Sequence, residues 1–237
     1  MTSCEPPRAT DDVTTSSGRL YDVVVPVKRL DVAKSRLVDL GDDLRRDLVV
    51  AFLLDTLDAV VASPAVARVA VVTDDPVVVS AVSDLGFLAR GVAIVADTAS
   101  GGLNPALHRG VAALRTRRPP SPYGVLALCA DLPGLTTTAV SDLLGMAPEG
   151  RAGFVADRAA TGTTAYVTHD VRHFDPRFGP GSRAAHLAQG SKELSGVVGE
   201  AIRCDVDVRE DLDHVGVRAG RWTTQVLARH EYSPLLG

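Results

Sequence analysis

The chain has 237 residues, of which 46% are hydrophobic and 23% charged, and its formal net charge is -4. This composition is typical of a globular protein with a sizeable core. It disfavours a nucleic-acid-binding or membrane-binding surface, because such surfaces usually carry a basic excess. No apolar run is long enough to cross a bilayer, and residues 1–20 lack the apolar segment of a signal peptide. The three cysteines are an odd, low number typical of a reducing compartment, so we expect a cytoplasmic protein.

Strand-like apolar runs alternate with helical patterns along most of the chain. The centres of these runs are continuously apolar, which is typical of strands covered on both faces. The predicted strands are 22–27, 66–73, 91–96, 124–130, 153–157, 163–168 and 201–207. The predicted helices are 42–62, 76–85, 103–116, 136–146, 182–190, 208–218 and 221–231. This alternation predicts an α/β protein with a mostly parallel, doubly wound sheet.

The same pattern predicts one domain over residues 21–219. Residues 1–20 are expected to form a flexible tail, and residues 220–237 a C-terminal helix and tail. In sheets of this kind, ligands bind at the carboxyl ends of the strands. Chemistry is therefore expected from the residues that follow each strand.

A basic loop follows the first predicted strand. It contains Lys28, Arg29, Lys34 and Arg36, although the whole chain has only three lysines. A compact ammonium group suits a point contact with a phosphate. The loop therefore suggests a polyphosphate site, and the alternative is an ordinary solvated basic loop.

Acidic residues stand at the ends of two other predicted strands. Asp131 follows the fourth strand in the segment CADLPG, and Asp205 and Asp207 lie two residues apart on the seventh. Two-residue spacing on an extended chain directs both side chains to one face. If the three carboxylates meet beside the basic loop, they suit Mg²⁺. Taken alone, Asp131 could be a turn residue and Asp207 a helix N-cap.

Small and polar residues cluster in two later segments, 154–164 and 176–186. Gly179 and Gly181 would let backbone N–H groups approach a ligand, and Ser182 would cap a short helix. Plain turn chemistry is the alternative. The segment Gly101–Pro105 precedes a helix and could approach a nucleotide. The motifs GxxxxGK[ST], GxSxG and GxGxxG are absent, which disfavours a P-loop NTPase, an α/β-hydrolase and an NAD-binding enzyme.

Five segments in this order resemble the guanylyltransferases of deazaflavin coenzyme F(420) biosynthesis, over about residues 21–215. They are PVKRLDVAKSRL, CADLPGL, FVADRAATGTTA, PRFGPGSRAAH and RCDVDVREDL. The resemblance implies a single-domain, Rossmann-like nucleotidyltransferase fold with three layers and a mostly parallel mixed sheet. Related sugar-nucleotide and molybdopterin enzymes have a glycine-rich first loop. Its replacement here by PVKRLDVAKSRL favours the F(420) branch.

The resemblance implies a reaction in which GTP and a phosphorylated three-carbon acid give a guanosine diphospho-conjugate and pyrophosphate. The arginine-rich, lysine-poor composition favours the branch that uses phosphoenolpyruvate, with enolpyruvyl-diphospho-guanosine as product. 2-Phospho-L-lactate and 3-phosphoglycerate are alternative acceptors, and a non-catalytic nucleotide-binding protein is the alternative of another class. A homodimer, and hand-over of a labile product to the next pathway enzyme, are further hypotheses about partners.

The resemblance also assigns roles to particular residues. The acid would be held at Thr163, Gly179 and Ser182. Mg²⁺ would be bound by Asp131 and by one or both of Asp205 and Asp207. From the chemistry of the loops themselves, we expect the nucleotide to contact Pro26, Lys28 and Asn104. The residues expected to act in catalysis are Lys28, Lys34, Arg36 and Asp131.

Overall fold

The computed structural model describes residues 18–30, 35–98, 101–116 and 123–232. Lys34 and most of the predicted N-terminal tail lie outside these ranges. The backbone of Arg36 is described, but its side chain is not. The predictions for Lys34 and for the Arg36 side chain therefore stay predictions.

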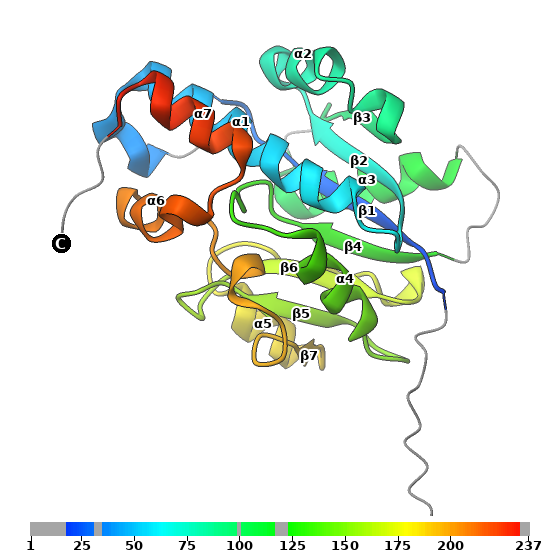
Figure 1. Cartoon of the computed structure of the whole chain (residues 1–237). Helices are drawn as coiled ribbons and strands as arrows, with labels where there is room; N and C mark the ends of the chain where they lie inside the picture. Colours follow the sequence, from blue (N-terminus) through cyan, green and yellow to red (C-terminus); the bar gives the residue numbers. More distant parts are fainter. Residues whose placement is uncertain (1–17, 31–34, 99–100, 117–122, 233–237) are drawn as a thin grey trace, which may run out of the picture.

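One seven-stranded sheet forms the centre of the molecule, with the order β3-β2-β1-β4-β6-β5-β7 (Figure 1). Its strands are β1 (Tyr21–Pro26), β2 (Val66–Thr73), β3 (Val92–Ala96), β4 (Gly124–Leu128), β5 (Gly153–Ala156), β6 (Thr163–Thr168) and β7 (Lys192–Glu193). Strand β1 pairs in parallel with β2 and β4, β2 with β3, and β5 with β7. Only β6 runs against its neighbours β4 and β5. The predicted mostly parallel mixed sheet is confirmed.

The direction of β6 decides which residues share an edge of the sheet. Leu128 at the end of β4 is paired with Ala165 near the start of β6. The first residue of β6, Thr163, therefore lies at the same edge as the residues that follow β4. An antiparallel strand brings its beginning, rather than its end, to the carboxyl edge of its neighbours.

The predicted strand at residues 201–207 is wrong. Residues Glu200–Ile202 form a short 3₁₀ helix, η4, and residues 204–207 have no regular secondary structure and belong to no strand of the sheet. The apolar side chains Cys204 and Val206 are buried among helices rather than on the sheet. The Val206 N–H donates to the carbonyl oxygen of Asp131 (N···O 3.1 Å). This bond ties the segment directly to the loop after β4.

The predicted helices agree with the structure to within a few residues at their ends. They are α1 (Asp42–Val61), α2 (Pro76–Asp84), α3 (Leu103–Thr116), α4 (Thr137–Gly145), α5 (Ser182–Ala188), α6 (Arg209–Val215) and α7 (Arg221–Arg229). The other short 3₁₀ helices are η1 (Ser35–Leu40), η2 (Leu88–Arg90), η3 (Val171–His173) and η5 (Gly216–Arg218). None of the helices in the described ranges is long and apolar enough to cross a membrane.

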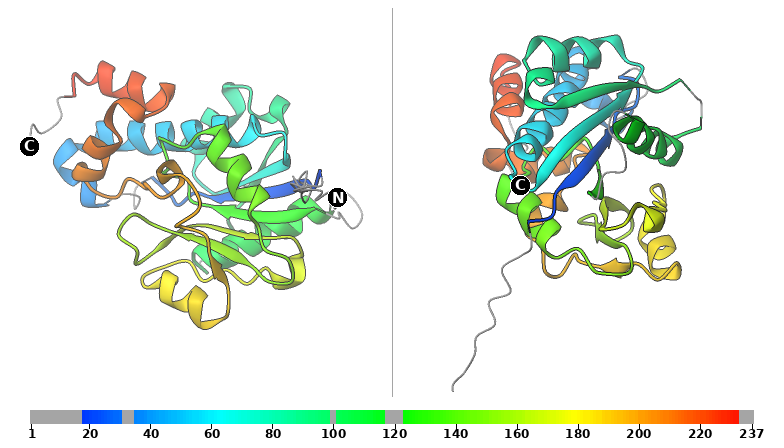
Figure 2. Two further views of the ribbon diagram at one scale, coloured as in Figure 1. Left: turned by 60° about the horizontal axis from the view of Figure 1, so that its bottom comes forward. Right: turned by 90° about the vertical axis from the view of Figure 1, so that its right-hand side faces the viewer.

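Helices cover both faces of the sheet, which makes three layers. Val23 and Val25 of β1 are buried in a cluster with residues of α1, α2 and α4, whereas Val24 lies in a second cluster with α3. This alternation is the two-residue period of a strand covered on both sides. The right-hand view of Figure 2 shows α1 and α7 on one side of the sheet and α3 on the other. The predicted three-layer arrangement is confirmed.

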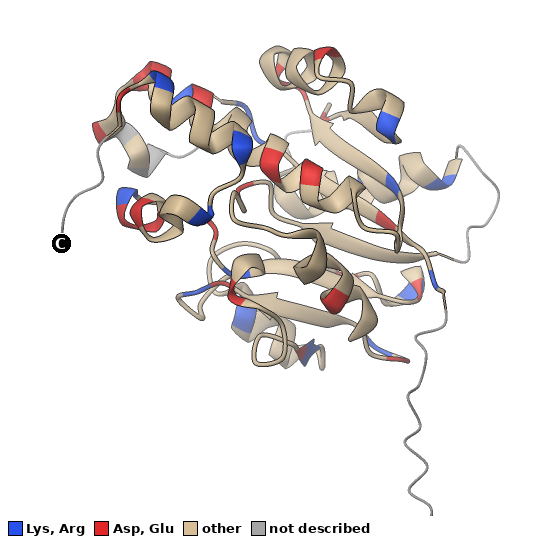
Figure 3. Ribbon diagram, viewed as in Figure 1, with Lys and Arg blue, Asp and Glu red and all other residues tan. Residues whose placement is uncertain are grey.

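The C-terminal helix α7 is fixed to α1 by buried polar contacts. The Asp55 carboxylate of α1 is 5% exposed and accepts hydrogen bonds from the N–H groups of Trp222 and Thr223 (2.9 Å each). These bonds satisfy N–H groups that the first turn of a helix leaves without a partner. Asp58, one turn further along α1, forms ion pairs with Arg90 (2.6 Å) and Arg221 (2.9 Å). Figure 3 shows basic and acidic residues interspersed along these helices.

Candidate active site

A cavity of about 670 Å³ opens at the edge of the sheet where β1 and β4 end and β6 begins. Most of the site residues expected from the sequence line it. Those lining it are Pro26, Lys28, Asp131, Thr163, Gly179, Ser182, Asp205 and Asp207. The structure therefore brings together segments that are up to 181 residues apart in the chain (Pro26 to Asp207).

Three carboxylates meet at one side of this cavity. Asp131, Asp205 and Asp207 each offer an oxygen, and these oxygens lie within 4.8 Å of one another. Like charges this close repel unless a cation or a proton separates them. Carboxylate oxygens are hard donors, and one or two of them with water and substrate phosphates are what Mg²⁺ usually accepts. The donor set therefore fits a divalent cation.

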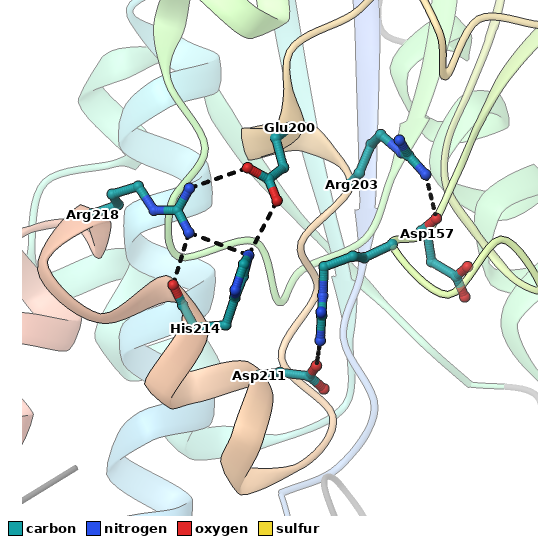
Figure 4. Close-up of polar contacts among 7 residues, drawn as sticks. Asp157, Glu200, Arg203, Asp211, His214 and Arg218 are labelled. Carbon is teal, nitrogen blue, oxygen red and sulfur yellow. Dashed lines mark hydrogen bonds and ion pairs between the residues drawn. The ribbon is translucent and has the colours of Figure 1, made fainter. Parts of the chain in front are cut away.

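Ion pairs and backbone hydrogen bonds fix the segment that presents Asp205 and Asp207 (Figure 4). The Asp211 carboxylate accepts hydrogen bonds from the Arg158 guanidinium (2.8 Å) and from the N–H groups of Asp207 and Val208 (3.1 Å each). Burial raises the pKa of Asp211, but these hydrogen bonds outweigh burial and lower it overall. Arg203 donates to the backbone oxygens of Ala156 and Asp157. The acidic segment is thus attached to the end of β5.

A second group of potential metal ligands lies beside this segment. Glu200, Cys204 and His214 have ligand atoms within 4.8 Å of one another. The Arg218 guanidinium already occupies this group, because it donates to Glu200 Oε2 (3.2 Å) and lies 3.2 Å from His214 Nε2 (Figure 4). Burial also raises the pKa of the Cys204 thiol, which disfavours the thiolate form that metals bind. We therefore assign no metal site here.

The start of the basic loop lies at the end of β1. Pro26 and Lys28 line the cavity, and the Lys28 side chain is exposed. The loop is held two residues later, where the Leu30 N–H donates to Asp75 Oδ2 (2.9 Å) and the Leu30 carbonyl accepts from Arg45 (3.2 Å). The backbone that carries Lys28 is thus fixed by strand β1 on one side and by the bonds of Leu30 on the other.

The Asn104 side chain is bonded to a neighbouring loop. It does not line the cavity, and its side-chain amide pairs with the backbone of Phe178. Asn104 Oδ1 accepts from the Phe178 N–H (2.8 Å), and Nδ2 donates to the Phe178 carbonyl (3.0 Å). These bonds hold the loop that precedes Gly179, a residue whose φ of +135° favours glycine. A direct contact between Asn104 and a nucleotide stays a prediction.

Thr163 and Ser182 lie next to each other in the wall of the cavity. The Ser182 hydroxyl lies 3.0 Å from Thr163 Oγ1, and both side chains are buried. Thr163 Oγ1 also lies 3.0 Å from Nδ1 of His186, which is 0% exposed. The turn before Thr163 is held by Asp157, which accepts from the N–H groups of Thr161 and Gly162. Sequence reasoning missed His186, because a lone histidine in a short helix shows no site pattern.

Burial lowers the pKa of His186 from 6.5 to about 4, and the nearby Arg177 adds to this effect while Asp175 opposes it. The unfolded chain therefore binds a proton between these pH values that the folded chain does not. The contribution of neutral His186 to the free energy of unfolding is fully present above about pH 6.5. It decreases as the pH falls towards 4, by roughly 3 kcal/mol in all. We expect the difference in unfolding free energy between the wild type and His186→Asn to shrink over this range in urea titrations. A difference that stays constant from pH 7 to pH 4 would contradict the shift.

The fold is one that solved nucleotidyltransferases share. Two solved structures share the fold: a nucleotidyl transferase from Methanothermobacter (TM-score 0.58, 18% identity, 90% of this chain and 100% of that chain) and a 4-diphosphocytidyl-2C-methyl-D-erythritol synthase (TM-score 0.56, 15% identity, 84% and 99%). The family model described as guanylyl transferase CofC-like matches residues 21–222. The chain belongs to this family, and the resemblance seen in the sequence is confirmed.

Individual relatives are similar over nearly their whole length. A phosphoenolpyruvate guanylyltransferase of Streptomyces coelicolor is 43% identical over 211 residues, which cover 88% of this chain and 96% of the relative. A protein of the same name from Streptomyces avermitilis is 45% identical over 193 residues, with 81% and 86% covered.

Proposed function

We propose that this protein is a phosphoenolpyruvate guanylyltransferase of coenzyme F(420) biosynthesis. It transfers GMP from GTP to phosphoenolpyruvate and releases enolpyruvyl-diphospho-guanosine and pyrophosphate. The observation that carries this proposal is the position of the acidic cluster, Lys28 and the buried hydroxyl pair around a single cavity. Two anions must meet for this reaction, and the cavity offers a separate means of binding each of them.

The reaction is an in-line displacement at phosphorus. An oxygen of the acid's phosphate forms a bond to the α-phosphorus of GTP, and the bond from that phosphorus to the bridging oxygen breaks. Pyrophosphate leaves with the electron pair. The nucleophile is already anionic, so the chain needs neither a strong general base nor a covalent intermediate. Its contribution is positioning and neutralisation of charge.

Each group of residues has its part in this proposal. Asp131, with Asp205 and Asp207, holds a divalent cation, and we propose Mg²⁺. When bound, this cation supplies the positive charge that lets two anionic substrates approach and that stabilises the transition state. Lys28 offers its ammonium group to the triphosphate and to the departing pyrophosphate. Lys34 and Arg36 follow in the same loop and are proposed to act with it.

The part of the cavity lined by Thr163 and Ser182 is proposed to bind the acid. Thr163 and Ser182 present hydroxyl groups there, and Gly179 lets the backbone approach a ligand closely. Asn104 supports this wall through Phe178. These groups are small and polar, and their O–H and N–H groups can donate hydrogen bonds to a carboxylate or phosphate oxygen of a three-carbon acid.

Pyrophosphate release in the presence of Mg²⁺ tests this function. GTP is combined in parallel with phosphoenolpyruvate, 2-phospho-L-lactate and 3-phosphoglycerate, and ATP replaces GTP in a matched set. Release with GTP and phosphoenolpyruvate alone is expected. Release with a different acid would keep the reaction and correct the substrate. A folded protein that binds GTP but releases no pyrophosphate with any acid would overturn the proposal in favour of a nucleotide-binding role.

Ser182→Ala tests which substrate the hydroxyl pair serves. We expect the KM for the acid to rise by about five- to tenfold, as the loss of one hydrogen-bonding hydroxyl predicts, while the KM for GTP changes little. Steady-state kinetics with each substrate varied in turn measure both constants. Ser80→Ala, on the exposed face of α2, is the matched control. An equal rise in both KM values would count against a role of Ser182 in binding the acid.

A further inference from the structure

His186 is the buried member of a chain of hydrogen bonds that ends at the cavity. Its ring lies among Phe154, Tyr166 and Phe178, with centroid distances of 5.1, 4.9 and 5.9 Å. Both ring nitrogens have polar partners: Nε2 lies 2.9 Å from the backbone nitrogen of Arg177, and Nδ1 lies 3.0 Å from Thr163 Oγ1. The ring does not line the cavity itself.

The partner of Nε2 determines where the proton of the ring lies. A backbone N–H can only donate, so Nε2 must accept the hydrogen bond from Arg177 and carry no hydrogen. The ring is neutral, since burial lowers the pKa of His186 to about 4. Nδ1 therefore carries the single hydrogen and donates it to Thr163 Oγ1. The backbone of one loop thus selects the tautomer of a side chain in α5.

A count of hydrogens shows what this tautomer does to the hydroxyl pair. Thr163 and Ser182 have one hydroxyl hydrogen each, and the single bond between their oxygens uses one of them. The Thr163 hydroxyl does not donate its hydrogen to His186, because Nδ1 is the donor in that bond. One hydroxyl hydrogen is left for a group outside this chain of bonds. With the other tautomer, Thr163 would donate to Nδ1 and Ser182 to Thr163, and no hydrogen would be left.

We propose that His186 is a positioning residue that makes the Thr163–Ser182 pair a hydrogen-bond donor to the anionic acid substrate. Because the Ser182 hydroxyl donates to Thr163 Oγ1, the remaining hydrogen is that of the Thr163 hydroxyl, and Thr163 lines the cavity. A donor is what a carboxylate or phosphate oxygen requires, whereas an acceptor facing it would repel it. The part that concerns the acid rests on the proposed function, and the part that concerns the tautomer stands by itself.

The tautomer is measured directly by nuclear magnetic resonance. Protein labelled with ¹⁵N in its histidines gives long-range ¹H–¹⁵N correlations that distinguish a ring nitrogen with a hydrogen from one without. The correlations that disappear in His186→Asn identify His186 among the six histidines. At pH 7 we expect the hydrogen on Nδ1 and none on Nε2. A hydrogen on Nε2, or on both nitrogens, would overturn the inference whether or not the enzyme is active.

Two variants separate the functions of the two nitrogens. The Asn side chain places its amide near the position of Nδ1, so His186→Asn keeps a donor for Thr163. The longer Gln side chain reaches the position of Nε2, so His186→Gln keeps an acceptor for Arg177 and loses that donor. We expect His186→Gln to raise the KM for the acid about tenfold and that for GTP hardly at all, with a smaller rise in His186→Asn. His173→Asn, at an exposed histidine, is the control.

The outcomes distinguish this inference from the proposed function. An active wild type in which His186→Gln leaves the KM for the acid unchanged, or raises both KM values equally, would overturn the positioning role alone. An inactive wild type would overturn the proposed function and with it the assignment of the acid, while the NMR result still decides the tautomer. Melting curves of both variants show whether they are folded at the assay temperature.

Discussion

Asp131→Asn is expected to lower turnover about a hundredfold or more while the fold is kept. The amide has nearly the shape of the carboxylate but no charge, so it binds a divalent cation weakly. Asp131 lies where the loop after β4 meets the segment of Asp205 and Asp207. Loss of its charge should therefore weaken the binding of a cation by all three side chains. Pyrophosphate release measures the turnover, and circular dichroism checks the fold.

A second readout does not depend on activity. Mg²⁺ or Mn²⁺ should raise the melting temperature of the wild type, because a ligand that binds only the folded state stabilises it. The rise should be much smaller in Asp131→Asn. Asp142→Asn removes an exposed carboxylate from α4 and should behave as the wild type does in both experiments. Turnover close to that of the wild type in Asp131→Asn would refute the proposed role of this carboxylate.

Gly110→Val is expected to destabilise the protein by about 3 kcal/mol or more. Gly110 lies in the middle of α3 and is buried against the sheet. A side chain at this position would overlap Val24 Cγ1 of β1 and would come within 2.8 Å of Val72 Cγ2 of β2. The absence of a side chain thus lets α3 lie close to both strands. Unfolding in urea, followed by circular dichroism, measures the loss.

Ala112→Val is the matched control on the same helix. Ala112 is exposed, so this change introduces the same β-branched side chain and lower helix propensity without the overlap. It should cost less than about 1 kcal/mol. Gly110→Val itself does not lower helix propensity, so a loss no larger than that of Ala112→Val would contradict the expected overlap with the sheet. The helix also supplies Leu103 and Leu107 to the cavity wall, so a displaced α3 should raise the KM for both substrates.

Local patterns in the sequence predicted most of the secondary structure. The predicted helix over residues 103–116 has the same bounds in the structure, and the predicted strands 66–73 and 163–168 do as well. The helix buries one stripe of side chains against the core, and the strands bury both of their faces. The hydrophobic pattern of each element follows from that burial. The segment 201–207 shows where the pattern fails, since helices rather than a sheet cover its apolar side chains.

The sequence by itself determined the fold class and the set of charged residues from which the site is built. Residues that follow the strands of a parallel sheet lie at one edge of it, and that rule predicted that Asp131 and Lys28 share an edge. Only the tertiary structure decided the rest. Strand β6 runs antiparallel, which brings Thr163 to the same edge as Asp131, and no local pattern distinguishes a parallel from an antiparallel strand when both faces are buried. The role of His186 depends on its contacts with the Arg177 N–H and with Thr163, and contacts between separate elements of the fold leave no period in the sequence.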